Sequence, residues 1–493
     1  MDAQADVAMK FKKIGIVGAG NMGSMMGFAF SELGRDVSIW DVKSANIYGF
    51  MKQVSQCKGF KGKITGFYDM SEFAANLGER DDPKVFIISI THGDPTDQAL
   101  SKLRPELNEG DIIMDGGNEH YRNTKRRQKE CRDIGVDWIG MGISGGYQSA
   151  RHGPSLSPGG DNTALEEVMP LLELYAAKDP KSGVPCVSSI GPGGSGHFVK
   201  MVHNGIEVGM LSALCEAWSF LNTGMGLDYH QIGQAFQQWN NEGELHGTFL
   251  VKIAADACKA RKHDGGYVLD DVLDKVVQDG DASEGTPIMV NRRIRLEAHI
   301  VPDTRRRTFF PHCFGESPRT AQGRPERRHA PAKTFAGPYI APFFASYCQG
   351  LELIARASID EGWNIRLSGC IRIWRAGCII QSEFIADMLE PFLNMNKTPT
   401  NAKLDSRVGR ELQRNYGVLK DIVSRGLAYD DYIPALSATL EYMKCSGGTM
   451  LPTRFVEAQM DYFGAHSYDK PGVPGEDPGP VAKGAHDYEW KPA

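Results

Sequence analysis

The residues best suited to catalysis lie in one short stretch of the sequence, 196–207. If this stretch is helical, its polar residues fall at i, i+3, i+4 and i+7 and share one face: Lys200, His203, Asn204 and Glu207. That face would offer a base, an acid and two hydrogen-bonding groups. A solvated polar stripe is the alternative, but Lys200 and Glu207 are too far apart for the usual i,i+4 ion pair. Because the neighbouring residues are mostly apolar, we expect a buried helix whose ionisable groups are functional.

A glycine-rich turn near the N-terminus predicts a dinucleotide-binding site. The run 13–17 has the composition of a buried strand, and residues 24–33 have that of a helix. Between them stand Gly18, Ala19, Gly20, Asn21, Met22 and Gly23, a GxGxxG pattern in its expected strand-to-helix context. The glycines permit a tight turn and a close approach of the pyrophosphate, and the free amides of the helix start attract the phosphates.

An acidic residue follows the next predicted strand, 36–40. Asp41 lies about 20 residues beyond the glycines, where a carboxylate accepts hydrogen bonds from the adenosine ribose hydroxyls. A carboxylate there repels a 2′-phosphate, so Asp41 favours NAD over NADP. The nearby Lys43 could soften that preference, and a helix-capping role for Asp41 is the alternative.

The remaining pattern predicts a Rossmann-type doubly wound α/β domain followed by a large all-α domain and an extended C-terminal tail. Further short apolar runs at 85–90, 111–114 and 136–140 read as strands of a parallel sheet. Two small polar loops, 115–118 and 144–146, follow strands at the edge where such sheets bind ligands, although either could be a simple glycine turn. Long helical periodicity begins after the Gly/Pro cluster 191–194. We therefore place the domains at 12–192 and 193–465, with the tail at 466–493.

Composition limits the possible partners. The chain has 493 residues, a formal net charge of −6 and 41% hydrophobic residues, which gives no sign of nucleic-acid binding. Ten cysteines occur without CxxC pairs or zinc-type spacing, so neither a disulfide framework nor a metal site is expected. The sequence has neither a signal peptide nor a membrane span, and we expect a cytoplasmic protein.

Together these motifs resemble 6-phosphogluconate dehydrogenase, the decarboxylating enzyme of the pentose phosphate pathway and of gluconate utilisation. The resemblance rests on the 18–23 turn and the 196–207 helix, and on further segments in the same order along the chain: 115–118, 144–146, 153–156, 373–380 and 461–466. It implies an NAD(P)-dependent oxidative decarboxylation of a 3-hydroxy sugar acid, with 6-phosphogluconate giving ribulose 5-phosphate. No metal is required, because the ketone formed at C3 is the electron sink.

The resemblance also implies roles for individual residues. Lys200 resembles the general base that takes the 3-hydroxyl proton, and Glu207 resembles the acid that protonates C1 of the enediol. The resemblance implies that the substrate is oriented by Asn118, Ser144, Gly145, Gly146, His203, Asn204 and, from a neighbouring subunit, His466. Ile90, Thr91 and His92 occupy the loop that faces the nicotinamide, and Asn118 serves both the substrate and the cofactor. A homodimer, with the tail threaded onto its partner, is the implied assembly.

Departures from the family affect the substrate phosphate and the cofactor. The family holds the phosphate with a Tyr after the helix Glu, a Lys before a Gly-Thr-Gly turn, and an Arg before Asp-Tyr-Phe-Gly-Ala-His; these positions are Val208, Glu284 and Met460 here. Since charge-assisted hydrogen bonds contribute about 1.5–3 kcal/mol each, a related sugar acid without the phosphate is the alternative substrate. The family's Asn-Arg-Thr pattern implies NADP, whereas Asp41 in the matching position favours NAD.

One segment, 287–333, does not resemble the family and is dense in Arg and Pro. A frame-shifted or intron-derived segment would give this pattern, and a disordered insertion or a basic interaction arm are the alternatives. The same segment leaves open a third hypothesis, a non-catalytic paralogue that binds dinucleotide without performing chemistry.

Overall fold

The computed structural model describes residues 10–79, 82–273, 337–395, 402, 405–447, 453–477 and 483–490. The chain forms two compact units, residues 1–440 and 441–493. The departures predicted at Glu284 and in 287–333 lie outside the described residues, and they remain predictions. The domain boundaries drawn from the sequence likewise remain predictions.

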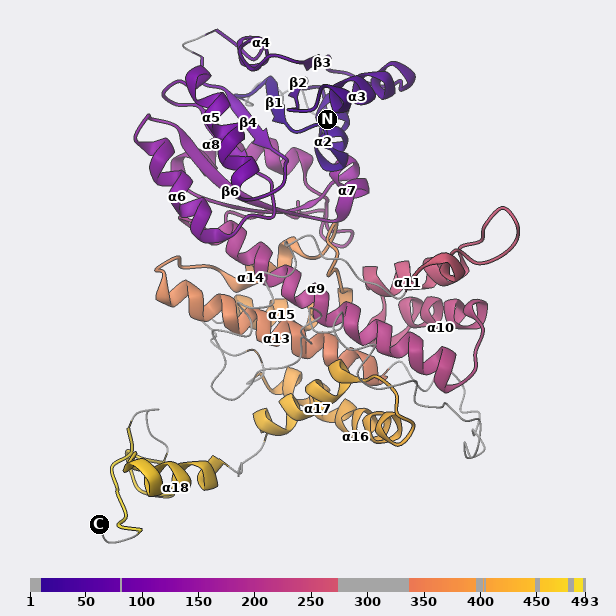
Figure 1. The fold of residues 1–493 in the computed structure, drawn as a ribbon, viewed down its shortest axis with the longest axis vertical. Helices are drawn as coiled ribbons and strands as arrows, with labels where there is room; N and C mark the ends of the chain where they lie inside the picture. The colour runs from indigo at the N-terminus through magenta and orange to yellow at the C-terminus, as the bar shows by residue number, and fades with distance from the viewer. Residues whose placement is uncertain are drawn as a thin grey trace. The chain divides into compact units, whose positions relative to one another are not determined.

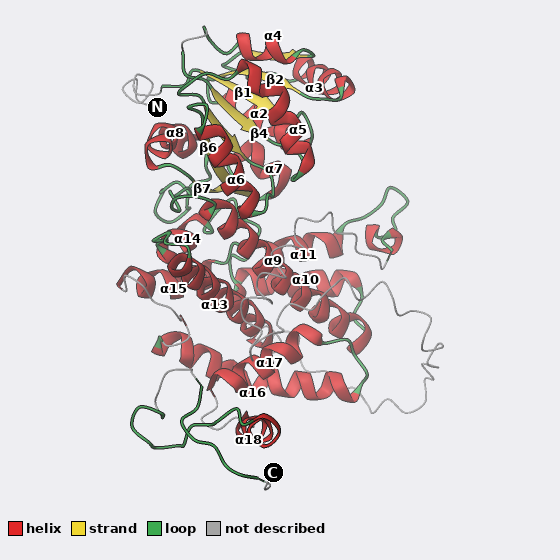
Figure 2. Ribbon diagram, turned by 60° about the vertical axis from the view of Figure 1, so that its left-hand side comes forward, coloured by secondary structure: helices red, strands yellow, loops and turns green. Residues whose placement is uncertain are grey.

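A seven-stranded sheet forms the N-terminal part of the first unit (Figure 2). Its spatial order is β3-β2-β1-β4-β5-β6-β7, and neighbouring strands are parallel except for the β6–β7 pair. The order reverses between β1 and β4, which creates the crevice where doubly wound sheets bind ligands. The strands are β1 (Lys13–Val17), β2 (Asp36–Trp40), β3 (Ile64–Phe67), β4 (Val85–Ile88), β5 (Ile112–Asp115), β6 (Asp137–Ser144) and β7 (Ser155–Gly159).

Both faces of the sheet are buried under helices. Along β5, Ile112 and Met114 belong to one apolar cluster and Ile113 to the other, as the two-residue period of a strand requires. One cluster includes buried residues of α2 (Asn21–Glu32), α3 (Ser44–Gln56) and α8 (Asn162–Tyr175). The other includes residues of α4 (Met70–Ala75), α5 (Asp94–Leu103) and α6 (Tyr121–Arg132). This two-sided burial explains why the strands read as continuous apolar runs.

Helix α9 (Ser195–Ser219) connects the sheet to the helices that follow (Figure 1). It contacts β6 and β7 near its start and α13 (Gly337–Asp360) further along. Gly196 makes this contact possible, because a Cβ there would collide with the backbone of β6 and β7. The other α-helices that the structure describes in the first unit are α7 (Gly146–His152), α10 (Tyr229–Asn241), α11 (Phe249–Lys259), α14 (Leu367–Ile373), α15 (Glu383–Met395) and α16 (Ser406–Ala428), and α17 (Pro434–Gly447) begins in it.

The second unit contains α18 (Thr453–Gly464) and the C-terminal tail. The carboxylate of Asp461 accepts hydrogen bonds from the backbone N–H groups of Ser467 and Tyr488 and from the indole of Trp490. One buried side chain therefore fastens the described part of the tail to α18.

The predicted fold class is confirmed. The structure adds strands β3 and β7, and it extends the helix predicted in 196–207 as far as Ser219. None of the described helices combines the length and apolar character needed to cross a membrane.

Candidate active site

The glycine turn has the geometry that a pyrophosphate needs. Gly18 has φ +111°, and a Cβ at Gly18 or Gly23 would collide with a backbone carbonyl, of Ser89 or of Gly18 itself. Gly20 faces open space at the start of α2. The turn is therefore packed tightly against the backbone of Ser89 and against its own backbone. It is open where phosphates would meet the free amides of the helix.

Asp41 is held from three directions at the end of β2. Its carboxylate accepts hydrogen bonds from the N–H of Ala19 at 2.8 Å, the N–H of Lys43 at 2.7 Å and the amide of Asn46 at 3.1 Å. The bond to Ala19 places the negative charge directly beside the glycine turn. The structure thus fixes the carboxylate beside the turn, and its contact with adenosine stays a prediction.

Helix α9 presents three ionisable or amide side chains to a cleft that the glycine turn also lines: Lys200, Asn204 and Glu207. Lys200 is 8% exposed and the Glu207 side chain 26%. Burial raises the pKa of Glu207, and the charge of Lys200 opposes that rise. A carboxyl group that holds its proton at higher pH is suited to act as an acid.

His203 lies behind this surface and is 1% exposed. Ser144 accepts the backbone N–H of Ile379 through Oγ at 3.1 Å, and the same Oγ lies 2.7 Å from His203 Nε2. His203 Nδ1 lies 3.1 Å from the side-chain oxygen of Asn204 and therefore carries the proton. Burial, followed by the charge of Lys200, lowers the pKa of His203 well below its ordinary value. A neutral imidazole thus orients Ser144 and Asn204.

A cleft of about 980 Å³ joins these parts. The predicted residues that line it are Gly18, Gly20, Asn21, Met22, Asp41, Ile90, Thr91, Asn118, Ser144, Gly145, Gly146, Lys200, Asn204 and Glu207. Ala19, Gly23, His92 and His203 are not among its lining residues, and His466 belongs to the second compact unit. The structure therefore brings the predicted dinucleotide turn and the predicted catalytic helix into one continuous cavity.

Several supporting residues were not anticipated. His197, fully buried, donates from Nε2 to the carbonyl of Asp115 at 3.0 Å, so its Nδ1 accepts the hydroxyl of Thr124 at 2.6 Å. Arg127, also fully buried, forms ion pairs with Glu119 and Asp97. The sequence held one signal: Arg127 follows Tyr121 and Thr124 at the spacing of the buried face of α6.

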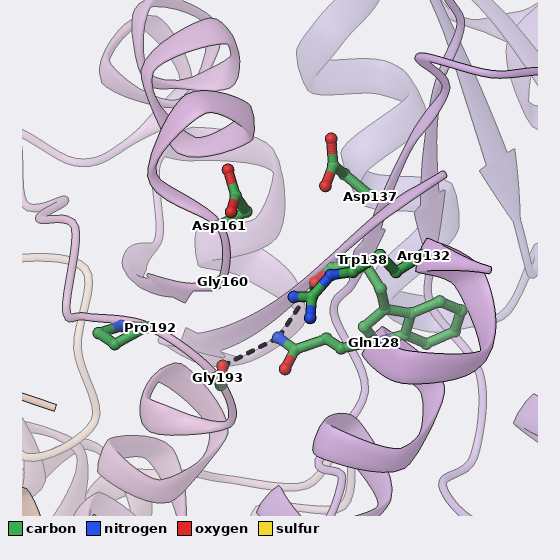
Figure 3. Close-up of a pocket in the computed structure, with 8 residues that line it drawn as sticks. All are labelled: Gln128, Arg132, Asp137, Trp138, Gly160, Asp161, Pro192 and Gly193. Carbon is green, nitrogen blue, oxygen red and sulfur yellow. Dashed lines mark hydrogen bonds between the residues drawn. The ribbon is translucent and has the colours of Figure 1, made fainter. Parts of the chain in front are cut away.

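A second pocket, of about 70 Å³, lies where α6 meets the segment before α9 (Figure 3). The amide of Gln128 donates to the carbonyls of Trp138 at 3.1 Å and Gly193 at 2.9 Å. A pocket of this volume has room for only a few waters, far less than a substrate requires. We therefore assign it a bracing role. Across the described residues, no cluster of three or more His, Cys, Asp or Glu side chains could hold a metal ion.

Comparisons with known proteins identify relatives of both parts. Residues 13–191 match the model of the NAD binding domain of 6-phosphogluconate dehydrogenase, and residues 196–292 and 303–490 match that of its C-terminal domain. A decarboxylating 6-phosphogluconate dehydrogenase of Emericella nidulans is 54% identical over 96% of this chain and 100% of its own length. The NADP(+)-dependent decarboxylating 6-phosphogluconate dehydrogenase of Bacillus subtilis is 31% identical, over 94% and 98%. The Plasmodium falciparum 6-phosphogluconate dehydrogenase structure, determined without ligand, with NADP+ and with 6-phosphogluconate, has a TM-score of 0.82 and 29% identity, covering 94% of this chain and 98% of that one.

Proposed function

This chain belongs to the 6-phosphogluconate dehydrogenase family, and on that premise we propose that it catalyses the oxidative decarboxylation of 6-phosphogluconate to ribulose 5-phosphate with a nicotinamide dinucleotide. The observation that carries the proposal is the single cleft shared by the glycine turn and the polar face of α9. The tight turn at Gly18, the open face at Gly20 and the carboxylate of Asp41 suit a dinucleotide. The bound nicotinamide supplies the hydride acceptor.

The first proposed step belongs to Lys200. As a neutral amine it takes the proton of the 3-hydroxyl while hydride leaves C3, and a buried position favours the neutral form before reaction. The amine, now protonated, then stabilises the negative oxygen at C3 while the C1–C2 bond breaks and carbon dioxide departs. The ammonium group is thus present when negative charge moves from the carboxylate to the oxygen at C3.

The second proton transfer belongs to Glu207. The enediolate left by decarboxylation takes a proton on carbon, which restores a carbonyl at the former C3, and burial keeps the Glu207 carboxyl protonated to higher pH than usual. Glu207 lies two turns from Lys200 along α9, so the two groups can serve opposite ends of a small substrate. Asn118, Ser144 and Asn204 line the same cleft, and we propose that they orient its hydroxyl and carboxylate groups.

For the cofactor we propose a preference for NAD. Although relatives such as the Bacillus subtilis enzyme are named for NADP+, the carboxylate of Asp41 lies beside the glycine turn, where we expect it to repel a 2′-phosphate. Lys43 and Lys102 also line this part of the cleft and reduce the repulsion. We therefore expect the protein to favour NAD over NADP and still to accept NADP.

A second candidate substrate is a sugar acid without the phosphate. Val208 is buried and apolar where the family places a hydroxyl-bearing phosphate contact, directly after Glu207. Met460 likewise offers no charge. Two apolar replacements weaken phosphate binding and leave the chemistry of Lys200 and Glu207 untouched.

For the assembly we propose a homodimer in which the tail and His466 reach a neighbouring active site. The second unit exposes large apolar side chains that favour burial against a partner: Phe455, Phe463, Tyr488 and Trp490. Light scattering of the intact chain and of a truncation after residue 465 tests this proposal. A monomeric intact chain would refute it.

The decisive experiment compares 6-phosphogluconate and gluconate with each of NAD+ and NADP+. Coupled carbon dioxide release and reduced-nicotinamide absorbance should appear with the wild type and be lost in Lys200→Met, which should still bind dinucleotide. Turnover of gluconate alone would favour the second candidate. No carbon dioxide release from any pair would support a non-catalytic paralogue and refute the proposal.

A further inference from the structure

A buried guanidinium holds together two loops that border the cleft. Arg127 projects from α6 and has no exposed surface. Its Nη1 donates to Glu119 at 2.5 Å, its Nε to Asp97 at 2.7 Å and its Nη2 to the carbonyl of Gly93 at 3.0 Å. We call these four residues the Arg127 clamp.

The clamp grips Gly93 from both sides. The N–H of Gly93 donates to Glu119 Oε2 at 2.8 Å, while its carbonyl accepts from Arg127. Gly93 has φ +76° and precedes the first turn of α5, so its backbone conformation is one that side chains rarely allow. The backbone N–H and carbonyl of Gly93 are thus both held by the Arg127–Glu119 ion pair.

Each end of the clamp lies within two residues of one that lines the cleft, Thr91 on one side and Asn118 on the other. Gly93 directly follows the loop 90–92, which comes after β4, and Glu119 directly follows Asn118, which comes after β5. Because β4 and β5 are neighbouring parallel strands, these loops meet at the same edge of the sheet. The separation of Gly93 and Glu119 therefore follows the separation of the proposed nicotinamide loop, 90–92, from the proposed substrate loop that contains Asn118.

The electrostatics make the arrangement rigid. Burial alone would raise the pKa of Glu119, but hydrogen bonds from Gly93 and Arg127 outweigh it and lower that pKa to about 2. A buried charge left without its partner is costly, so neither loop can move without breaking the pair. The other Glu119 oxygen accepts from the N–H of His120 and the amide of Asn123, which fixes the carboxylate in turn.

We propose that Arg127 and Glu119 are positioning residues, which set the distance between the loop 90–92 and Asn118 and thereby align the nicotinamide with the sugar acid. This inference rests on the proposed function, because alignment matters only if hydride passes between the two. A displacement of about 1 Å between reacting groups can lower a rate about a hundredfold.

The test compares Glu119→Gln and Arg127→Met with a matched control, Arg126→Gln. Arg126 is the neighbouring, exposed arginine and also binds Asp97, but its other partner is Glu130. We expect kcat to fall about 10- to 100-fold in the two clamp variants and to stay near wild type in the control. Glu119→Gln keeps the side-chain shape and decides the matter if Arg127→Met fails to fold.

A second readout does not depend on turnover. Reduced dinucleotide should bind the clamp variants with altered nicotinamide fluorescence, whereas the affinity for ADP-ribose, which lacks the nicotinamide, should stay unchanged. A merely structural role would weaken both ligands together. Wild-type kcat and unaltered fluorescence in both variants would overturn the inference. A wild type that shows no turnover would instead overturn the proposed function, and the fluorescence would still test the clamp.

Discussion

Replacing Asp41 by Asn should shift cofactor preference toward NADP. The substitution removes one negative charge and keeps an oxygen that can accept the N–H of Lys43. It also turns one carboxylate oxygen into an amide that cannot accept from a backbone N–H such as that of Ala19. We therefore expect a change in selectivity together with a loss of stability of about 1 kcal/mol.

The size of the selectivity change follows from Coulomb's law. Two unit charges about 4 Å apart repel by about 1 kcal/mol in water and by about 4 kcal/mol at an effective dielectric constant of 20. Asp41 is half-buried beside an open cleft, so we take the lower half of that range. A change of about 1–2.5 kcal/mol corresponds to a rise of about 5- to 70-fold in the NADP-to-NAD ratio of kcat/KM.

The assay measures initial rates with both dinucleotides at saturating sugar acid. Asp36→Asn is the matched control, because Asp36 lies at the opposite end of β2 and its carboxylate accepts the N–H of Lys63. The control should keep the wild-type ratio. A wild type that strongly prefers NADP, or an Asp41→Asn ratio equal to that of the wild type, would refute the reasoning.

Three further changes test the scaffold. Gly142→Ala places a Cβ against the stem of Lys200, so we expect kcat to fall and the free energy of unfolding, measured in urea, to fall by about 1–3 kcal/mol. The control, Gly49→Ala, lies in open space on α3 and should leave that free energy unchanged or raise it. Glu216→Ala leaves two N–H groups at the start of α17 without their carboxylate and should cost about 3 kcal/mol by the same urea measurement; a loss near zero would contradict the capping role. The pKa of Glu119 is about 2 when folded and 4.5 ordinarily, so its stabilisation is complete above pH 4.5 and is lost as pH falls toward 2. The stability difference between wild type and Glu119→Gln should therefore shrink over that window, and a constant difference would count against it.

The sheet was largely predictable because burial on both faces leaves a plain signal. β1 and β2 match their predicted runs, since continuous apolar segments of that length are typical of buried parallel strands. β3 and β7 lie at the two edges of the sheet and were missed. β3 has only four residues, one of them Gly66, and β7 contains Pro158, so neither carries an apolar pattern.

Only those parts of the site that lie within a single turn or helix could be predicted from the sequence. The glycine turn and the polar residues of α9 are local patterns, and each was found from spacing alone. The Arg127 clamp joins α6 to two loops, and His197 joins α9 to β5. Such contacts depend on which segments become neighbours, and a run such as Lys125-Arg126-Arg127 does not reveal that its third residue is buried while its second is exposed.

His203 shows how helix geometry refines a spacing argument. At about 100° per residue, Asn204 and Glu207 lie within about 40° of Lys200 around α9, whereas His203 is rotated by about 60° to the side. That rotation points the imidazole at the Oγ of Ser144 and at Cys378, whose Sγ lies 3.3 Å from Nε2, so that His203 lies behind residues that line the cleft. All four residues share a face in the coarse sense, but only three meet the cavity. The fourth supports them as a neutral hydrogen-bonding partner, because a second charge beside Lys200 would oppose the protonated state of Lys200 that we propose for decarboxylation.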